Sequence, residues 1–392
     1  MMILVANPGS TSYKCKLYDL QDMDVLYQAT VERIGDAEGI YSYQFLGEEK
    51  LSDRMAIPDY FEAVNLTLET IKTKYTIQDV NAVGFKTVHA QGVTGCVELS
   101  DEVVKAMEEY ISLAPVHTQV YLTAISVFKK ILPETMLVGL FETAFHINIP
   151  PEAYLYGIPY EYYQKHGIRK YGFHGASHRY IGHRTKELFF PHQDSWKVIS
   201  CHLGGSASVC AIKDGWSIDT SMGMSPQSGL LNAKRVGDLD PFALLYLMEK
   251  ESMSIQDVRD VLMSKSGIYG ISGISGDFRD IEKGMMQGRK RDELAFKTFV
   301  YYVRRYIGEY LVILNGADCI AFTAGAGQNS PRLRKEIVRN MENLGIFLDR
   351  ERNDANPKEG LISKENSPVK VAVIPTNEEL IVVKEVEKFL QK

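Results

Sequence analysis

The chain has 392 residues, 45% hydrophobic and 24% charged, a composition typical of a globular protein of one or two domains. Its net charge of −6 argues against a nucleic-acid partner, and no apolar run approaches the roughly 18 residues of a membrane-spanning helix, so no membrane partner is expected. Five scattered cysteines without CxxC spacing, and no recognisable signal peptide, favour a cytoplasmic location.

The first predicted elements are two strands joined by a very polar segment. An apolar run stops at Asn7 and a second strand-like run follows Ser12, which leaves the six residues "NPGSTS" as a turn. An ordinary hairpin needs only two turn residues. Small side chains and a glycine allow a phosphate to approach backbone N–H groups, and Lys14 adds a positive charge. The segment does not match the GxxxxGK(S/T) pattern, which disfavours a P-loop enzyme.

The rest of the first half alternates helices and strands. An amphipathic helix is predicted over Asp59–Tyr75 and a second helix over Val116–Leu132. Strands are predicted over Val80–Ala90 and Pro133–His146, and the latter ends in the acidic Glu142. This alternation predicts the α/β class.

The second half repeats the opening plan. Over Trp196–Gly215, a strand runs into a turn of glycines and hydroxyls and then into another strand. A third glycine-rich turn, Gly325–Asn329, follows a buried strand, after which Ser330 is placed to cap a helix with Pro331 in its first turn. Two such hairpins would suit a phosphate clamp, although a tight strand–helix turn explains Gly325–Asn329 equally well. Arg291–Gly316 is the longest predicted helix, with aromatic positions typical of a core or a subunit interface.

Three polar residues at predicted element ends are candidates for phosphoryl transfer. His174 lies in a turn between Phe173 and Gly175, Arg235 precedes two aspartates, and Glu378 lies at a strand–helix junction. Two of them also have a structural explanation: His174 could be a hydrogen-bonded core histidine, and Glu378 could be an acidic residue that stabilises the first turn of a helix. The residues alone leave these alternatives open.

Several longer motifs, taken together and in order, resemble the acetate kinase family, the acetate and propionate kinases of the actin/Hsp70/sugar-kinase superfamily. They are "YGFHGASHRY" (171–180), "DTSMGMSP" (219–226), "RVGDLDP" (235–241), "SGISGDFRD" (272–280) and "IPTNEEL" (374–380). The resemblance covers essentially the whole chain. It implies two actin-like (ribonuclease H-like) domains, each a mixed sheet flanked by helices, with the active site in the cleft between them. The N-terminal domain would comprise 1–147 and about 380–392, and 148–379 would bind nucleotide and form a homodimer.

The resemblance also implies a reaction and its residues. ATP would phosphorylate a short-chain carboxylate, acetate first and propionate second, reversibly and by direct in-line transfer, with Mg²⁺ or Mn²⁺. Asn7 and Glu378 would hold the metal, and Glu142, His174 and Arg235 would be catalytic. Lys86, Val88, Val116, His117, Phe173 and Pro226 would bind the carboxylate substrate. The nucleotide would contact Ser10, Ser12, Lys14, His202, Leu203, Gly204, Gly205, Ser206, Asp277, Phe278, Arg279, Gly325, Ala326, Gly327, Gln328 and Asn329.

The chain departs from the family pattern close to these positions. Lys86 stands where the family usually has arginine, and lysine cannot offer a carboxylate the bidentate fork of arginine. Glu142 replaces the family's catalytic aspartate and is one methylene longer. Further departures are Lys234, Gly205 and Gln328, which replace a threonine, an asparagine and a glutamate. They leave two alternatives: a kinase for butyrate, a longer acid or a pyrophosphate donor, or a degenerate regulatory protein that binds nucleotide.

Overall fold

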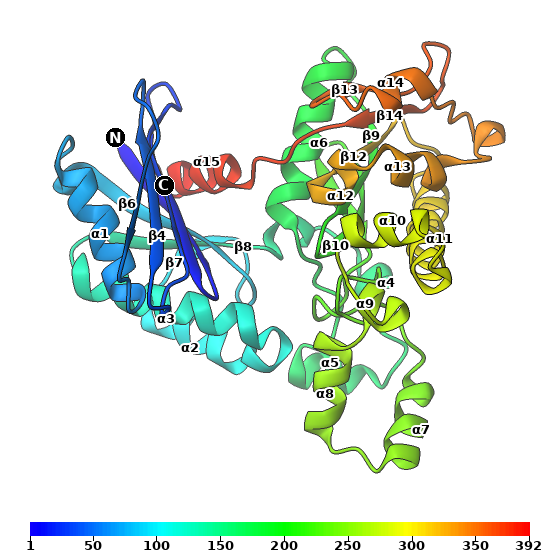
Figure 1. Ribbon diagram of the computed structural model, residues 1–392, viewed down its shortest axis with the longest axis horizontal. Coiled ribbons are helices and arrows are strands. Elements are labelled where there is room, and N and C mark those ends of the chain that lie inside the picture. The colour runs from blue at the N-terminus through cyan, green and yellow to red at the C-terminus, as the bar shows by residue number, and fades with distance from the viewer. The chain divides into compact units, whose positions relative to one another are not determined.

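The computed structural model describes all residues, 1–392, and divides into two compact units. The first comprises Met1–Ala144 and Glu378–Lys392, and the second comprises Phe145–Asn377. Each unit contains one mixed sheet with helices against it, which confirms the α/β class (Figure 1). None of the helices is both long enough and apolar enough to cross a bilayer.

The sheet of the first unit has eight strands in the order β5-β4-β3-β2-β1-β6-β8-β7. Strands β1 to β5 pair antiparallel, whereas β1, β6 and β8 run parallel to one another. The strands are β1 (Met2–Gly9), β2 (Ser12–Asp19), β3 (Val25–Glu32), β4 (Gly39–Phe45), β5 (Leu51–Met55), β6 (Val80–Thr87), β7 (Cys96–Glu98) and β8 (Met136–Phe141). The helices are α1 (Tyr60–Lys72), α2 (Asp101–Glu109), α3 (Pro115–Ile131) and α15 (Glu378–Leu390), with 3-10 turns η1 (Ile77–Asp79), η2 (Ile111–Leu113) and, across the boundary, η3 (Ala144–His146).

The two faces of this sheet bury different helices. Leu4 and Ala6 of β1 join the core that contains the apolar sides of α1 and α3. Helix α15 packs against β1, β6 and β8. Its close approach depends on Gly84, because a Cβ there would lie 3.0 Å from Val382 and 3.1 Å from Val386. The chain end is thereby fixed to the strands that carry the candidate site.

The polar segment "NPGSTS" is not a six-residue turn, so that prediction is wrong. Strand β1 continues to Gly9, which pairs with Ser12, and only Ser10 and Thr11 form the turn. Pairing between β1 and β6 stops at Ala6, so Pro8 lies where β1 has one neighbouring strand and its missing N–H costs no ladder bond on that side. The surplus polar residues are therefore strand residues at an edge of the sheet.

The sheet of the second unit has six strands in the order β11-β10-β9-β12-β14-β13. Strands β9, β12 and β14 are parallel, and β9 and β10 form the second hairpin. The strands are β9 (Lys197–Leu203), β10 (Ala207–Lys213), β11 (Trp216–Thr220), β12 (Cys319–Thr323), β13 (Gly360–Leu361) and β14 (Lys370–Val373). The helices are α4 (Pro151–Tyr154), α5 (Tyr160–His166), α6 (Gly175–Phe189), α7 (Pro241–Glu251), α8 (Ile255–Ser264), α9 (Gly267–Ser272), α10 (Phe278–Met286), α11 (Lys290–Ile313), α12 (Ala324–Asn329), α13 (Pro331–Val338) and α14 (Arg350–Asp354), with the 3-10 turn η4 (Glu342–Leu344).

Helix α6 contacts strands β9, β11 and β12 of this sheet, and helix α11 contacts β9 and β10. The alternating side chains of β9 divide accordingly: Ile199 belongs to the core with α11, whereas Val198 belongs to the core with Ile181 of α6. The segment Gly325–Asn329 was predicted to be a turn, but it lies within the short helix α12. Ser330 does cap α13, since its hydroxyl accepts a hydrogen bond from Leu333 N.

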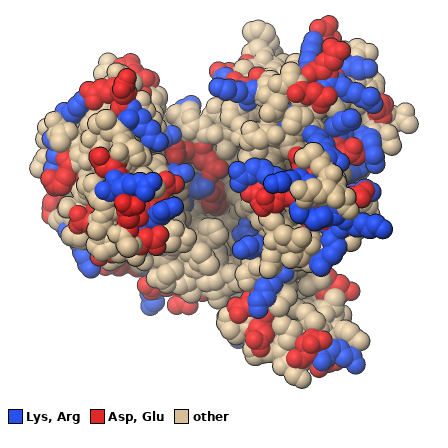
Figure 2. All heavy atoms as spheres, viewed as in Figure 1, with Lys and Arg blue, Asp and Glu red and all other residues tan.

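Charges of both signs are interspersed over the visible surface of each unit (Figure 2). Lysine and arginine side chains alternate with aspartate and glutamate, in keeping with the small net charge of −6. The electrostatic features that matter for the candidate site are therefore local pairs and unpaired charges rather than a broad field.

Candidate functional site

The carboxyl ends of three parallel strands bring polar residues together in the first unit. Strands β1, β6 and β8 are neighbours, and their ends carry Asn7, Lys86 and Glu142. Parallel strands finish at one edge of a sheet, which is where α/β folds bind ligands. Helix α15 starts at Glu378 and adds a fourth polar residue from the far end of the chain.

Lys86 links two carboxylates at this edge. Its ammonium group donates to Glu378 Oε2 and lies 3.1 Å from Glu142 Oε1, while the Glu142 side chain is only 7% exposed. Burial lowers the pKa of Lys86, but the two carboxylates outweigh burial and raise the pKa well above its ordinary value. The lysine is therefore charged, and it balances a carboxylate that water barely reaches.

The oxygen donors near Lys86 suit a magnesium ion that also binds phosphate oxygens. Mg²⁺ in such sites takes one or two carboxylates, several waters and the substrate phosphates. Glu378 offers a carboxylate, and the amide oxygen of Asn7 accepts only one long hydrogen bond, 3.4 Å from the Tyr121 hydroxyl. No cluster of three or more acidic, histidine or cysteine side chains forms a metal cage. The residues fit a metal shared with a nucleotide, not an all-protein metal site.

The remaining predicted residues of the first unit lie apart from this group. Ser10 is in the hairpin turn, and Ser12 and Lys14 are on β2, where Lys14 lines a groove with Lys16 and Glu379. Val88 follows β6 and is half-buried. The first turn of α3 carries Val116 and His117, both exposed. The structure of this unit alone does not assemble an acyl pocket from Val88 and Val116.

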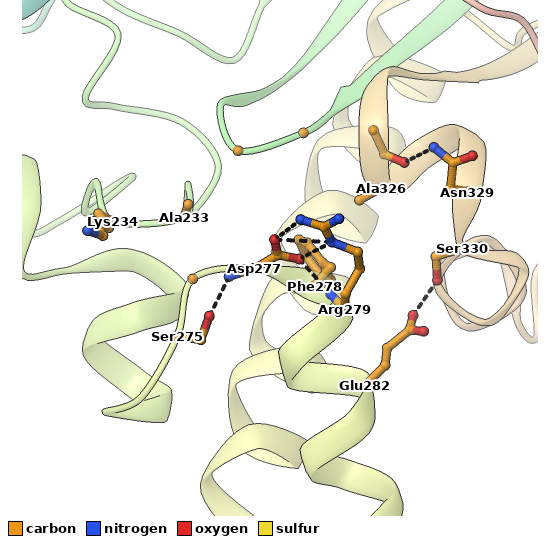
Figure 3. Close-up of a pocket in the computed structure, with 14 residues that line it drawn as sticks. Ala233, Lys234, Ser275, Asp277, Phe278, Arg279, Glu282, Ala326, Asn329 and Ser330 are labelled. Carbon is orange, nitrogen blue, oxygen red and sulfur yellow. Dashed lines mark hydrogen bonds and ion pairs between the residues drawn. The ribbon is translucent and has the colours of Figure 1, made fainter. Parts of the chain in front are cut away.

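A cavity of about 640 Å³ in the second unit is lined by eight of the sixteen predicted nucleotide residues (Figure 3). It lies between the β9–β10 turn, the start of α10 and helix α12, and it includes Ser330 directly after α12. Asp277 caps α10 and forms an ion pair with Arg279, whose side chain is 90% exposed, and Ser330 donates to Glu282. The predicted residues that line the cavity are Gly204, Gly205, Asp277, Phe278, Arg279, Gly325, Ala326 and Asn329.

Besides Ser10, Ser12 and Lys14 of the first unit, five predicted nucleotide residues of the second unit do not line this cavity. Leu203 is fully buried in the core with α11, and Gly327 lies under the cavity wall against β9. Ser206 and Gln328 are next in the chain to the lining residues Gly205 and Asn329, whereas His202 lies on β9 with its ring stacked on His174. The lining residues that sequence reasoning missed are Ala233, Lys234, Ser275, Gly276, Glu282 and Ser330. Ser275 and Gly276 fall inside the quoted "SGISGDFRD" motif, which was the available signal.

Arg235 is a half-buried cation without an acidic partner. Its guanidinium donates to Ser206 Oγ and, at 3.2 Å, to Asn232 Oδ1, and both acceptors are neutral. Burial lowers the pKa of Arg235 to about 10, so the side chain remains charged at neutral pH. Ala233 and Lys234, the two preceding residues, line the cavity. A half-buried positive charge with no acidic partner at this position is suited to receive an anion.

His174 is held in an uncommon backbone conformation at the start of α6. Its φ of 57° is left-handed, which is unusual for a non-glycine residue and is often found at functional sites. Its ring stacks on His202, with centroids 4.1 Å apart, and its Nδ1 lies 2.8 Å from Ser208 Oγ. Phe173 and Pro226, predicted for the acyl pocket, are buried in the second unit.

Arg334 fixes helix α12 at the cavity and was not identified from the sequence. It is fully buried and donates to the backbone oxygens of Gly327 and Gln328. Further bonds reach Asn353 and Asn356. The last turn of α12, whose carbonyls would otherwise lack partners, is thus held by one side chain. Arg334 lies within a predicted helix, where an arginine is ordinarily exposed, so the sequence gives no sign that it anchors α12.

Comparison with known proteins identifies the same family over almost the whole chain. The model of the acetokinase family matches residues 2–384. Acetate kinase from Caldanaerobacter subterraneus subsp. tengcongensis is 44% identical over 398 aligned positions, covering 100% of this chain and 99% of the relative.

Two solved structures extend the similarity to the fold. Acetate kinase from Porphyromonas gingivalis superposes with a TM-score of 0.88 at 37% identity and covers 99% of both chains. A propionate kinase from Francisella tularensis subsp. tularensis gives a TM-score of 0.90 at 31% identity and covers 98% of both. These values confirm the predicted fold class.

Replacing Lys86 by methionine should destabilise the first unit. Glu142 would be left buried beside a second carboxylate with no cation, and breaking a buried ion pair in this way costs about 3 kcal/mol or more. The free energy of unfolding from urea titration followed by circular dichroism measures the loss. Lys129→Met is the matched control, since its partner Asp101 is 95% exposed and no measurable change is expected. Equal stability of the two variants would contradict this reading of Lys86.

Proposed function

The chain belongs to the acetokinase family, and is a phosphotransferase with a carboxyl group as acceptor; we propose that it transfers the γ-phosphoryl group of ATP to acetate first and propionate second. The products would be ADP and the acyl phosphate. The reaction is proposed to be reversible, because an acyl phosphate is itself a strong phosphoryl donor.

One observation carries the proposal for phosphoryl transfer. The half-buried guanidinium of Arg235 is hydrogen-bonded to neutral partners only, and the two residues before it line a cavity of about 640 Å³. Phosphoryl transfer needs little covalent chemistry from the protein, but it needs cations placed at the oxygens of the transferring group. A guanidinium that is partly shielded from water and pairs with no carboxylate meets that need.

The cavity favours a nucleotide over pyrophosphate as the donor. Its volume suits a nucleoside, and its walls combine Phe278 and Ala326 with the open backbone of Gly205 and Gly325, where even an added Cβ would meet no atom within 4 Å. Phosphates would lie toward the glycines, whose N–H groups can approach oxygen closely. Asp277 and Arg279, at the start of α10, are proposed for the adenosine end.

The first unit is proposed to bind the metal and the acceptor. Asn7 and Glu378 would hold Mg²⁺, which when bound neutralises phosphate charge and orients the phosphate oxygens. An ionised carboxylate has no proton to lose before it attacks, so Glu142 need not act as a base. We assign Glu142 to the orientation of Lys86, which in turn offers positive charge to the acceptor carboxylate. Without Lys86, the acceptor would meet the unbalanced charge of Glu142.

In-line transfer follows from these roles. An acceptor oxygen attacks the γ-phosphorus, the bond to the bridging oxygen of ADP breaks, and no phosphoenzyme forms. His174 and Arg235 are proposed to bind the equatorial oxygens, where charge accumulates in the transition state.

Trapping of acyl phosphate with hydroxylamine tests the proposed activity. Mg-ATP with acetate, propionate or butyrate in parallel should give product, with acetate ranked first and propionate second. Replacement of ATP by pyrophosphate should abolish it. A maximum with butyrate, or turnover only with pyrophosphate, would overturn the substrate or donor assignment. ATP binding without product from any acid would instead support a degenerate nucleotide-binding protein.

Arg235→Ala should reduce kcat by on the order of 10³-fold, because the transition state loses its charge-assisted hydrogen bonds. The hydroxylamine assay measures the rate, and circular dichroism checks that the fold is intact. Arg352→Ala removes an arginine of α14 that pairs with the exposed Glu365, and it should leave the rate unchanged. A loss of less than tenfold at Arg235 would remove this residue from the catalytic set.

We also propose a homodimer formed through the second unit. Helix α11 exposes Leu294, Tyr301 and Val312, the last of these to 80%, and α7 exposes Phe242 and Tyr246. Exposed apolar side chains gathered on two helices of a globular protein indicate an interface. Sedimentation should give twice the 44.2 kDa chain mass, and Tyr301→Glu should give the single chain. A wild-type protein that sediments as one chain would contradict the dimer.

A further inference from the structure

A layer of hydroxyl and imidazole groups lies between α6 and the β9–β10 hairpin. Ser208 stands opposite His202, and Ser200 opposite Cys210, so all four side chains share one face of the hairpin. The same layer includes the apolar Val198, Ile212 and Ile181, and the buried Ser177 of α6, whose Oγ lies 2.8 Å from His202 Nδ1. The polar groups of the layer must therefore satisfy one another.

Four of these groups form a continuous chain of hydrogen bonds. Ser200 Oγ lies 2.8 Å from His178 Nδ1, and His178 Nε2 lies 2.7 Å from Ser208 Oγ. Ser208 Oγ lies 2.8 Å from His174 Nδ1. Ser200, His178 and Ser208 are all fully buried, and only His174 is partly exposed.

The buried residues Ser200 and His178 determine which group donates in each hydrogen bond of this series. Burial lowers the pKa of His178 well below the ordinary value, with a further contribution from His146 and His202, so His178 is neutral and carries one N–H. Ser200 has His178 Nδ1 as its only hydrogen-bond partner. If that nitrogen carried the proton, the Ser200 hydroxyl would accept and its own buried hydrogen would have no acceptor, which is destabilising. Ser200 therefore donates to Nδ1, and the proton of His178 is on Nε2.

The direction then passes to His174. His178 Nε2–H donates to Ser208, whose single hydroxyl hydrogen is left to donate to His174 Nδ1. We propose that Ser208 is a positioning residue that holds neutral His174 in the tautomer with its proton on Nε2. The inference deepens the proposed function, on which its catalytic meaning rests: His174 would donate a hydrogen bond to the transferring phosphoryl group without being protonated to an imidazolium.

Nitrogen-15 NMR of histidine-labelled protein tests the tautomer without any assay of activity. At about pH 8, where an ordinary imidazole is neutral, His174 should show a bare Nδ1 and a protonated Nε2. The spectrum of His174→Gln assigns the signal among the nine histidines. A wild-type His174 with its proton on Nδ1 would overturn the proposal, whether or not the protein makes acyl phosphate.

Kinetics test the positioning role. Ser208→Ala should lower kcat about tenfold with KM for acetate and ATP little changed, because it removes the bond that orients His174. Ser208→Thr, which keeps the hydroxyl, should restore most of kcat. Ser217→Ala is the matched control: it removes a buried serine that lies 2.8 Å from His146 Nδ1, outside the chain, and should leave kcat unchanged.

The outcomes separate this inference from the proposed function. A kcat of Ser208→Ala within twofold of wild type, or an equal loss in Ser217→Ala, would overturn the positioning role. If Ser208→Ala does not fold, Ser208→Thr and the wild-type spectrum still decide it, since a threonine variant without activity but with native circular dichroism contradicts a role for the hydroxyl. If the wild-type protein phosphorylates no acid, the proposed function is refuted. The nitrogen-15 spectrum of His174 would then still test the proposed tautomer by itself.

Discussion

The candidate site in the first unit depends on the need of a buried carboxylate for a cation. Glu142 has 7% of its side chain exposed, and Lys86 is the charge that balances it. The same ammonium group binds Glu378, at the start of the last helix. One ion-pair group therefore connects the end of β6, the end of β8 and the start of α15, segments separated by more than half the chain. Gly84 permits this arrangement, because the absence of a side chain lets α15 pack close to β6.

The second unit shows the opposite electrostatic arrangement. Arg235 keeps its charge but is bonded to neutral groups, and its environment lowers its pKa rather than raising it. A cation already balanced by carboxylates, such as Lys86, must share its charge with an arriving anion, whereas Arg235 has no competing partner. This contrast is the physical basis for assigning metal and acceptor to one unit and the phosphoryl group to the other.

Two departures from the family pattern acquire a common explanation. Lys86 replaces a longer, forked arginine, and Glu142 replaces a shorter aspartate. In the structure Lys86 Nζ lies 3.1 Å from Glu142 Oε1, so the longer side chain of glutamate reaches the ammonium group of the lysine. Together the two side chains form an ion pair between the ends of β6 and β8. A lysine cannot offer the bidentate geometry of an arginine, but its charge balances that of Glu142.

The sequence by itself determined the α/β class, most strands and helices, the family, and the residue types of the site, because periodicity, capping residues and long motifs are local properties. It misplaced the turn at Asn7–Ser12 and the helix α12, since pairing with neighbouring strands and the anchor supplied by Arg334 decide where those elements begin and end. Only the tertiary structure decided that Lys86 pairs with Glu142 and Glu378, that Arg235 has no acidic partner, and that Ser200, His178, Ser208 and His174 form one chain. Burial and hydrogen-bond direction are set by residues distant in sequence, and the order of the amino acids does not display them.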